Sequence, residues 1–518
     1  MALPSDGGSS TSTVSLLSSG SAVRGTTGSG APAGYAAAAA RLQPGAGRGI
    51  GRRSRGTRTG VNLLPHRRRP RAESSRSPLW TWPTAGGVTA LVTAILLEQV
   101  RPRAGTGPAN LWPGDSDAAS AMLQVVATSS VTVAALTFSV TVVTLQLASQ
   151  QFSPRLLRRY ARDRVLKAVL TVLLSTLVFA LTTLSFMNSD EGLPTVALLT
   201  ASALGVTSLA AVLGFLNHII RQLRVDSMML AAHDETGEAI RKLCAGRDEP
   251  PPPSPDDLDL ELDPARGATV HGGSSGFVRL IDTGALVACA RRSDAVVRLD
   301  VRPGDLVVAG NPIATVWARD PAAGVPDPDA DGLAEKVDDA LELGYERTLE
   351  QDVAFGFRQL EDIAVKAMSP GINDPVTACT AAGHLADLLV RLAGRRLGPV
   401  LHLDEDGTGR LILPDRDLRY YLDLACGQLR RFAAAEPTVL AALLRMLRDL
   451  ATAVHGTGDE RDAAEVRRAA DLVRDTLDSS VGTEDAGQVH DLHRRVLAAL
   501  AGRTAEAYTD RSGETRSV

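Results

Sequence analysis

Four long apolar runs follow one another between Leu79 and Ile220, and they restrict the fold more than any other feature. The runs are Leu79 to Leu97, Ala119 to Leu147, Leu166 to Met187 and Leu193 to Ile220. A helix needs about 20 apolar residues to cross the roughly 30 Å hydrocarbon layer of a bilayer. One such run could be the core of a soluble protein, but four in succession predict four transmembrane helices in residues 79–224.

Arginines flank the predicted spans unequally. The only charged residues in the loop between the third and fourth spans are Asp190 and Glu191. Arginines, in contrast, precede the first span and are frequent in the loop after the second span. These arginines are Arg67, Arg68, Arg69, Arg71, Arg76, Arg155, Arg158, Arg159, Arg162 and Arg164. Because basic loops stay on the cytoplasmic side, both termini are predicted to be cytoplasmic. The scarcity of lysine beside abundant Arg, Ala and Gly is typical of a GC-rich bacterium. Together with the four apolar runs, this predicts a location in the bacterial inner (plasma) membrane.

The net charge of −4 conceals a split between one basic end and an acidic remainder. Residues 1–78 contain twelve Arg and no Lys, against Asp6 and Glu73. This segment is rich in Ser, Gly and Ala and lacks a periodic apolar pattern, so it is predicted to be a disordered tail. Because the basic excess is confined to this end, a uniformly basic nucleic-acid binder is excluded. The expected partner is the lipid bilayer, and no nucleic acid is expected.

A connector in residues 225–265, ending in a Pro- and acid-rich linker, leads to a β-rich unit in residues 266–330. Phe277 to Ile281, Leu306 to Val308 and Ile313 to Trp317 have strand character, and Pro303-Gly304 forms a turn between them. This arrangement resembles the hairpin of barrel-sandwich domains that carry biotinyl or lipoyl groups. No Lys stands at the hairpin tip to hold such a group, and no cofactor is predicted.

Residues 331–503 have a mainly helical pattern. Thr348 to Gln351 matches a capping box, which predicts a helix that ends at about Met368. Asp374 and Pro375 fit the N-cap and first position of the next helix. Further helices are predicted over 418–434, 437–455, 459–477 and 489–501, and residues 504–518 are predicted to be a disordered tail. The predicted class is therefore an α-helical integral membrane protein with a cytosolic α+β region, in which the small β barrel-sandwich-like unit precedes a helical bundle.

The four cysteines are far apart, at positions 244, 289, 379 and 426. No C-x-x-C pair occurs, and no His stands at zinc-finger spacing from any of them. We therefore expect buried, reduced thiols and no metal site.

Three motifs resemble one bacterial family. They are Q-L-A-S-Q-Q-F-S-P-R-L-L-R at the end of the second span, E-R-T-L-E-Q-D-V-A-F-G-F-R-Q-L-E-D-I-A, and S-P-G-I-N-D-P-V-T-A. Together they resemble the predicted membrane proteins of domain-of-unknown-function family 2254, and the similarity extends over about residues 79–501. The resemblance implies four membrane helices and a cytosolic region, and it brings no activity or catalytic residue.

The second span carries hydroxyl groups on one face, at Ser130, Thr137, Thr141 and Thr144. A pore-lining face of this kind could partly replace the hydration shell of an ion. Small and hydroxyl-bearing residues also let helices pack closely, so the sequence leaves pore lining and helix packing open. Since four spans are few for a carrier, a pore would require a homo-oligomer.

An interfacial elbow is predicted where the second span leaves the membrane, with candidate residues Phe152, Pro154, Arg155, Arg158 and Arg159. Aromatic and basic side chains suit contact with lipid headgroups. The same arginines could serve only to fix the topology.

A polar cluster in the helical region could form a cytosolic site. Its candidates are Gln351, Asp352, Gln359, Asp362, Ser369, Asn373 and Asp374. Carboxylates can bind a cation or act as acid and base, but the same residues could only cap helix ends. No Walker sequence, nucleophile elbow, H-E-x-x-H or dinucleotide fingerprint is present, so the sequence names no catalytic residue.

Three functions fit these features. The first is an oligomeric channel or transport-related protein with a cytosolic gating or sensing domain. The second is a membrane-anchored scaffold or sensor that binds a cytosolic partner or ligand. The third is a membrane enzyme that uses Asp352, Asp362 and Asp374.

Overall fold

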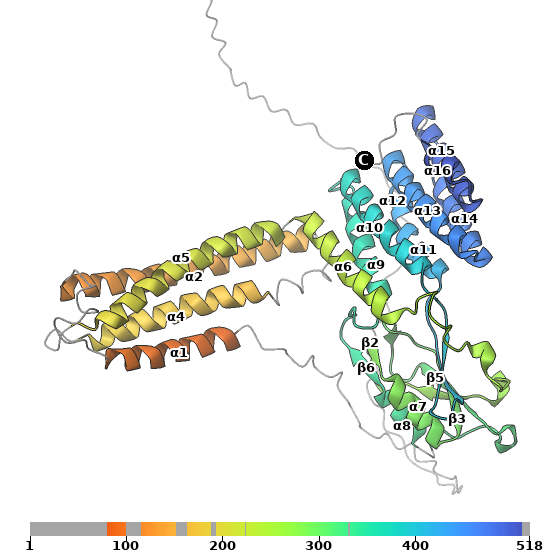
Figure 1. Ribbon diagram of the computed structural model, residues 1–518, viewed down its shortest axis with the longest axis horizontal. Coiled ribbons are helices and arrows are strands. Elements are labelled where there is room, and N and C mark those ends of the chain that lie inside the picture. Colours follow the sequence, from red (N-terminus) through yellow and green to blue (C-terminus); the bar gives the residue numbers. More distant parts are fainter. Residues whose placement is uncertain are drawn as a thin grey trace, which may run out of the picture. The chain divides into compact units, whose positions relative to one another are not determined.

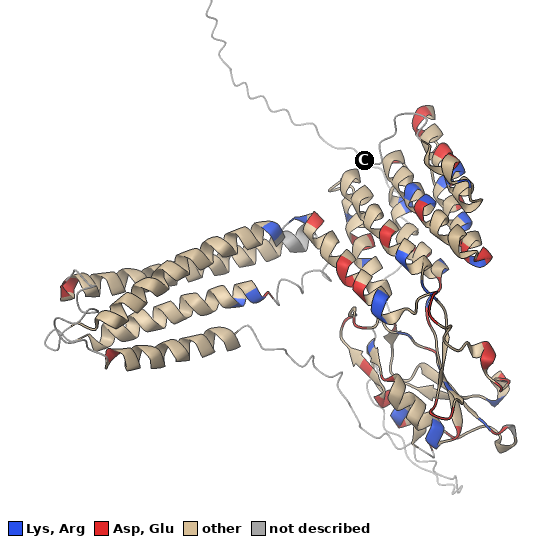
Figure 2. Ribbon diagram, in the orientation of Figure 1, with Lys and Arg blue, Asp and Glu red and all other residues tan. Residues whose placement is uncertain are grey.

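The computed structural model describes residues 80–99, 115–151, 163–187, 193–222, 224–329 and 332–509. Four apolar helices form its first group: α1 (Thr81–Glu98), α2 (Ser116–Gln151), α4 (Arg164–Phe186) and α5 (Thr195–Gln222) (Figure 1). Helix α4 packs against the other three, and α2 also contacts α5. Charged residues lie only near the ends of these helices (Figure 2). The predicted tail over residues 1–78 and the predicted elbow over residues 152–159 lie outside the described residues.

Within the described residues, four helices are long and apolar enough to cross a membrane: α2, α4, α5 and α10 (Pro375–Ala393). Three of them match predicted spans, but α10 takes the place of α1. The first half of α1 is rich in Thr and Gly, which lowers its hydropathy. Helix α10 belongs to the second helical group, where Leu385, Leu388 and Leu389 are fully buried. Its apolar character therefore stabilises a protein core.

The described strands build two sheets. The larger sheet has the order β1-β5-β3-β8-β7, with β3 and β8 parallel and all other pairs antiparallel. The smaller sheet is antiparallel, with the order β4-β2-β6. The strands are β1 (Ala268–His271), β2 (Gly276–Ile281), β3 (Ala295–Leu299), β4 (Leu306–Val307), β5 (Pro312–Ala318), β6 (Leu341–Gly344), β7 (Val400–Leu403) and β8 (Gly409–Leu413). Helix α7 (Thr283–Arg292) and helix α8 (Leu333–Asp339) contribute to the same apolar core.

This arrangement does not confirm a barrel-sandwich-like unit. Strands β6, β7 and β8 lie within residues 331–503, which the sequence assigned to helices, yet they complete the sheets begun earlier in the chain. Val297 of β3 pairs with Leu411 of β8, and both side chains are fully buried. The predicted boundary at residue 331 therefore does not separate strands from helices, because the sheet needs strands from both sides of it.

The second helical group surrounds one large apolar core. Its members are α6 (Val225–Leu243), α9 (Val353–Ala367), α10, α11 (Leu418–Cys426), α12 (Leu429–Phe432), α13 (Pro437–Thr457), α14 (Glu460–Arg474), α15 (Thr483–Leu500) and α16 (Thr504–Tyr508). The predicted start of α10 is confirmed, since Asp374 caps it through the backbone N–H of Thr377 at 3.1 Å. Hydrogen bonds from Thr377 hold the pKa of Asp374 below its ordinary value.

Three local predictions for this region are wrong. The capping box at Thr348 to Gln351 does not form, because α9 starts after Asp352 and the Gln351 side chain instead accepts from the Ile281 N–H at 2.8 Å. The helix expected over 418–434 is divided into α11 and α12. The segment expected as a tail begins with α16, whose Tyr508 hydroxyl donates to Asp449 at 2.8 Å.

Candidate functional site

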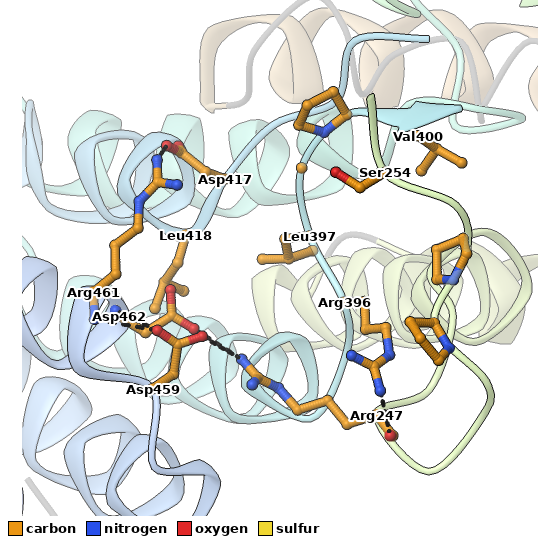
Figure 3. Close-up of a pocket in the computed structure, with 14 residues that line it drawn as sticks. Arg247, Ser254, Arg396, Leu397, Val400, Asp417, Leu418, Asp459, Arg461 and Asp462 are labelled. Carbon is orange, nitrogen blue, oxygen red and sulfur yellow. Dashed lines mark hydrogen bonds and ion pairs between the residues drawn. The ribbon is translucent and has the colours of Figure 1, made fainter. Parts of the chain in front are cut away.

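A pocket of about 300 Å³ lies where the chain leaves α6, between the ends of several helices (Figure 3). Its charged and polar lining consists of Arg247, Ser254, Arg396, Asp417, Asp459, Arg461 and Asp462. Leucine, valine and proline side chains complete the wall. The pocket therefore combines both signs of charge with an apolar surface, as ligand sites in proteins commonly do.

Two chain segments that follow helices hold one side of the pocket. The segment after α6 pairs with the segment after α10: Arg396 N–H donates to Ala245 at 2.9 Å, and Arg247 N–H donates to Gly394 at 3.2 Å. The Arg396 guanidinium also donates to the Arg247 carbonyl at 3.0 Å. These bonds fix Arg247 and Arg396 relative to each other and to both helices.

Two helix starts form the acidic side. Asp459 caps α14 by accepting from the backbone N–H groups of Arg461 and Asp462, each at 3.2 Å. Asp417 caps α11 by accepting from the Tyr420 N–H at 3.0 Å. Asp and other short polar residues suit these positions because a helix start leaves N–H groups without partners. The caps therefore place two carboxylates at the pocket.

Arg247 links the two sides. Its guanidinium donates to Asp462 at 2.9 Å and to Asp459 at 3.4 Å, and it also donates to the Ala393 carbonyl at 2.9 Å. Burial raises the pKa of Asp462, and the nearby Asp459 raises it further. Two carboxylates close together thus share one arginine.

The charges are arranged asymmetrically. In Figure 3, Asp417, Asp459 and Asp462 lie on one side together with Arg461, whose guanidinium donates to Asp417 at 3.3 Å. Arg396 and Ser254 lie on the other side, and Leu397 lies between them. A carboxylate side attracts a cationic group and a guanidinium attracts an anionic one. The pocket can therefore accept a small molecule that carries both charges.

A second charged cluster is buried and closed. Asp352 is 1% exposed, and its Oδ2 accepts from Arg347 Nε at 2.8 Å while its Oδ1 lies 3.4 Å from Arg416 Nη1. Arg416 donates to the Pro303 carbonyl at 2.8 Å and covers the Tyr420 ring. The pKa of Asp352 is raised, because the effect of burial exceeds the opposite effect of Arg347 and Arg416, which lower it. This cluster joins the strand region to the helices.

The structure does not bring the predicted cytosolic polar residues into one site. Asp352 precedes α9 and Asp374 follows it, so the 15-residue helix separates them by about 22 Å. Asp362 pairs with Arg358 on its own helix at 2.9 Å, and Gln359 is buried in the core of this helical group. Ser369 and Asn373 belong to the turn between α9 and α10. The Ser369 hydroxyl donates to the Lys366 carbonyl at 2.6 Å, and Asn373 has a φ of +49°.

The hydroxyl face of α2 points toward the other apolar helices. Ser130, Thr137 and Thr144 are buried and Thr141 is half-buried. The Ser130 and Thr137 hydroxyls donate to the carbonyls of Val126 and Val133, each at 2.8 Å. These bonds lie within α2, where Ser and Thr hydroxyls commonly bond to the carbonyl four residues earlier.

A histidine–carboxylate pair joins two of the apolar helices at one end. His218 Nε2 of α5 lies 2.7 Å from Asp163 Oδ2, and Asp163 caps α4 by accepting from the Val165 N–H at 2.8 Å. The two residues are 55 positions apart in the sequence, so the pair depends on the packing of the two helices.

All four cysteines are free and buried, as predicted. Burial raises the pKa of the Cys244 and Cys426 thiols to about 12 and that of Cys379 to about 11. Since the thiolate is the reactive form, we expect almost no maleimide modification of the folded chain at neutral pH and four modified thiols after unfolding. Mass spectrometry of the intact protein measures both numbers. Rapid modification of the folded chain would contradict this burial.

The sequence did not predict the pocket, because its residues come from four separate segments. A partial signal exists in G-D-E-R-D at residues 458–462, where a Gly and an Asp precede a helix that starts with acidic residues. It identifies a helix cap, but not that Arg247 reaches it from more than 200 positions earlier.

Comparison with known proteins agrees with the apolar helices. The family "Predicted membrane protein (DUF2254)" matches residues 76–449. Uncharacterized proteins of Mycobacterium tuberculosis and Mycobacterium bovis are 32% identical over 402 residues, which cover 75% of this chain and 74% of each relative. No solved structure matches the chain.

Proposed function

Because the chain belongs to domain-of-unknown-function family 2254 of predicted membrane proteins, we propose that it is a membrane-anchored sensor of a small zwitterionic ligand. In this proposal α1, α2, α4 and α5 cross the bacterial inner membrane with both termini in the cytoplasm. The strands and the second helical group form the cytosolic part. The ligand binds in the pocket at the end of α6.

The observation that carries this proposal is the course of α6. Only Leu223 and Arg224 separate α5 from α6, and Arg247 of the pocket follows soon after the end of α6. Along its length α6 buries Met229, Ala232 and Ile240 in the core of the second helical group. One helix thus connects a candidate membrane span with the pocket, so a change at either end can be transmitted to the other.

The outer faces of the first helical group support the membrane anchor. Large apolar side chains such as Val131 and Phe138 of α2 and Val206 and Leu213 of α5 are exposed there. A soluble protein rarely leaves so much apolar surface uncovered. Helix α1 fits the same group despite its lower hydropathy, since a Cβ at Gly86 would lie 2.8 Å from the Ser175 hydroxyl of α4.

The volume and charge of the pocket define the ligand. A volume of about 300 Å³ equals that of about ten molecules of liquid water, so a compound with about ten non-hydrogen atoms fits. An ammonium group suits the side of Asp417, Asp459 and Asp462, where three carboxylates face the guanidinium groups of Arg247 and Arg461 and leave an excess of negative charge. A carboxylate suits Arg396 on the other side. Glycylglycine has this size and both charges, and it serves as the probe.

Hydrogen exchange of the detergent-solubilised full chain tests the proposal. We expect glycylglycine to slow amide exchange in the pocket and along α6, because a bound ligand stabilises the state that binds it. Inorganic phosphate and ethylammonium, which carry one charge sign each, should have little effect. Arg396→Ala should remove the response, whereas Arg266→Ala in the strand region should keep it. Unchanged exchange of α6 with all three probes would contradict the sensor.

The alternative of an oligomeric channel has less support. The hydroxyl groups of α2 are directed into the helix group and bond to their own helix, so they offer a pore little surface. A channel would need a second copy of the chain and a different lining. The enzyme alternative also has less support, because Asp352, Asp362 and Asp374 lie apart and each pairs with different residues.

A further inference from the structure

The turn between α9 and α10 exposes apolar side chains. Ile372 is 46% exposed and Val376 is 60% exposed, and Pro370 and Gly371 beside them are exposed as well. The turn has internal hydrogen bonds: Ile372 N–H donates to Ser369 at 3.0 Å, and Asp374 N–H donates to Ala367 at 2.8 Å. It is therefore an ordered apolar tip, defined here as residues 370–376.

Contacts along α6 show which end of the helical group carries this tip. Helices α6, α9 and α10 lie side by side (Figure 1). His233 Nε2 of α6 lies 2.6 Å from Asp387 of α10, and Gly237, one turn further on, contacts Arg391. Helices α6 and α10 therefore run in the same direction, and their first residues lie at the same end.

The contact between α6 and α9 also places the apolar tip at the end of the helical group where α6 begins. Thr236 of α6 contacts Gly356 near the start of α9. From this contact, α6 extends back about three turns to its first residue, Val225. Helix α9 extends forward about three turns to its last residue, Ala367. Since Val225 and Met368 both pack on the same core, the apolar tip lies level with the start of α6.

The start of α6 is tied to the end of a membrane helix. Helix α5 ends at Gln222 and α6 begins at Val225, so their Cα atoms are at most about 11 Å apart. This limit follows from chain length alone. Arg221 and Arg224 at this junction are exposed, and arginines beside a span commonly contact lipid phosphates.

We infer that the apolar tip contacts the lipid surface of the bilayer that α5 leaves, with Ile372 and Val376 inserted among the headgroups and upper acyl chains. Lipid is the expected contact of the tip because the short connection from α5 to α6 keeps the start of α6, and the tip level with it, close to the bilayer. Amphipathic segments of this kind lie about 5–10 Å deep at the headgroup boundary. The tip would then hold the end of α6 that is nearest to the membrane. The inference depends on the membrane anchor of the proposed function, but not on its ligand.

Single-cysteine labelling of the full chain tests this contact. Ile372→Cys carries a bimane fluorophore in vesicles of phosphatidylcholine and phosphatidylglycerol, with or without brominated acyl chains. Leu403→Cys is the matched control, because Leu403 is 41% exposed in β7, which follows the opposite end of α10. The buried native thiols do not compete for the label. We expect brominated lipid to quench the label at position 372 at least about twofold more than that at 403, and aqueous iodide to quench mainly the label at 403.

A third label separates this inference from the membrane anchor. Val206→Cys lies on the outer face of α5, where the side chain is 70% exposed, and brominated lipid should quench its label strongly. If the label at 206 is quenched and that at 372 behaves like that at 403, the tip does not contact lipid and only this inference fails. If neither brominated lipid nor iodide quenches the label at position 372, a protein partner covers the tip, and the inference of a lipid contact is likewise overturned. If 206 is not quenched, the anchor itself fails.

Discussion

Replacing Asp352 with Ala is expected to lower the unfolding midpoint of the full chain by about 10 °C. The substitution removes the carboxylate that pairs with the half-buried Arg347 and leaves the buried Arg416 with Asp305, 3.5 Å away. Removal of one partner of a buried ion pair costs about 3–5 kcal/mol. In a domain of 150–250 residues each kcal/mol shifts the midpoint by about 2–4 °C. The rate of maleimide modification of the native thiols during heating measures this midpoint, because Cys244, Cys379 and Cys426 are buried until the helical group opens and Cys289 until the core of the strand region opens.

Asp362→Ala is the matched control for this substitution. Asp362 lies on the same helix, and its ion pair with Arg358 joins neighbouring turns, where the arginine is 27% exposed. Pairs in contact with water contribute about 1 kcal/mol or less. If Asp352→Ala unfolds at the same temperature as Asp362→Ala, the buried cluster does not stabilise the junction between the strands and the helices.

Two glycine substitutions are expected to act in opposite directions. At Gly356 a Cβ atom would collide with the Thr236 side chain of α6, so Gly356→Ala should force α6 and α9 apart and cost about 1–3 kcal/mol. At Gly383 the new Cβ would meet no side chain or other segment within 4 Å, apart from its chain neighbours and the backbone of its own helix. Gly383→Ala should therefore stabilise α10 by about 0.5–1 kcal/mol through higher helix propensity.

The same thiol assay measures both variants. Gly356→Ala should also increase amide exchange in α6, since that helix loses its closest neighbour. Equal midpoints for the two variants would mean that α6 and α9 do not depend on this close approach. The result also bears on the proposed sensor, in which α6 must stay packed to transmit a change between the pocket and α5.

Local sequence signals predicted much of the second helical group. Asp374 and Pro375 identified the start of α10 because a cap depends on residues within one turn. The capping box at Thr348 to Gln351 had an equally good local pattern but was wrong. Gln351 bonds to the backbone of Ile281 instead, 70 positions earlier in the chain, and no local pattern contains that partner.

Hydropathy likewise located apolar helices without stating what covers them. It identified α2, α4 and α5 as candidate spans, and the chain is a member of a family of predicted membrane proteins. By hydropathy alone α10 could also cross a membrane, although the sequence analysis placed this helix in the cytosolic region, and its leucines pack against other helices of its own group. The hydropathy of a helix records its average composition, whereas burial depends on its neighbours.

The sequence by itself determined the apolar helices, several helix starts and the burial of four widely spaced cysteines, because each depends on composition or on residues a few positions apart. Only the tertiary structure decided that β8 pairs with β3, that Asp352 meets Arg416 and that Arg247 meets Asp462. These contacts join residues separated by tens to hundreds of positions. They form only when the packing of whole helices and strands brings distant segments together, so the pocket and the position of the apolar tip follow from the fold rather than from any motif.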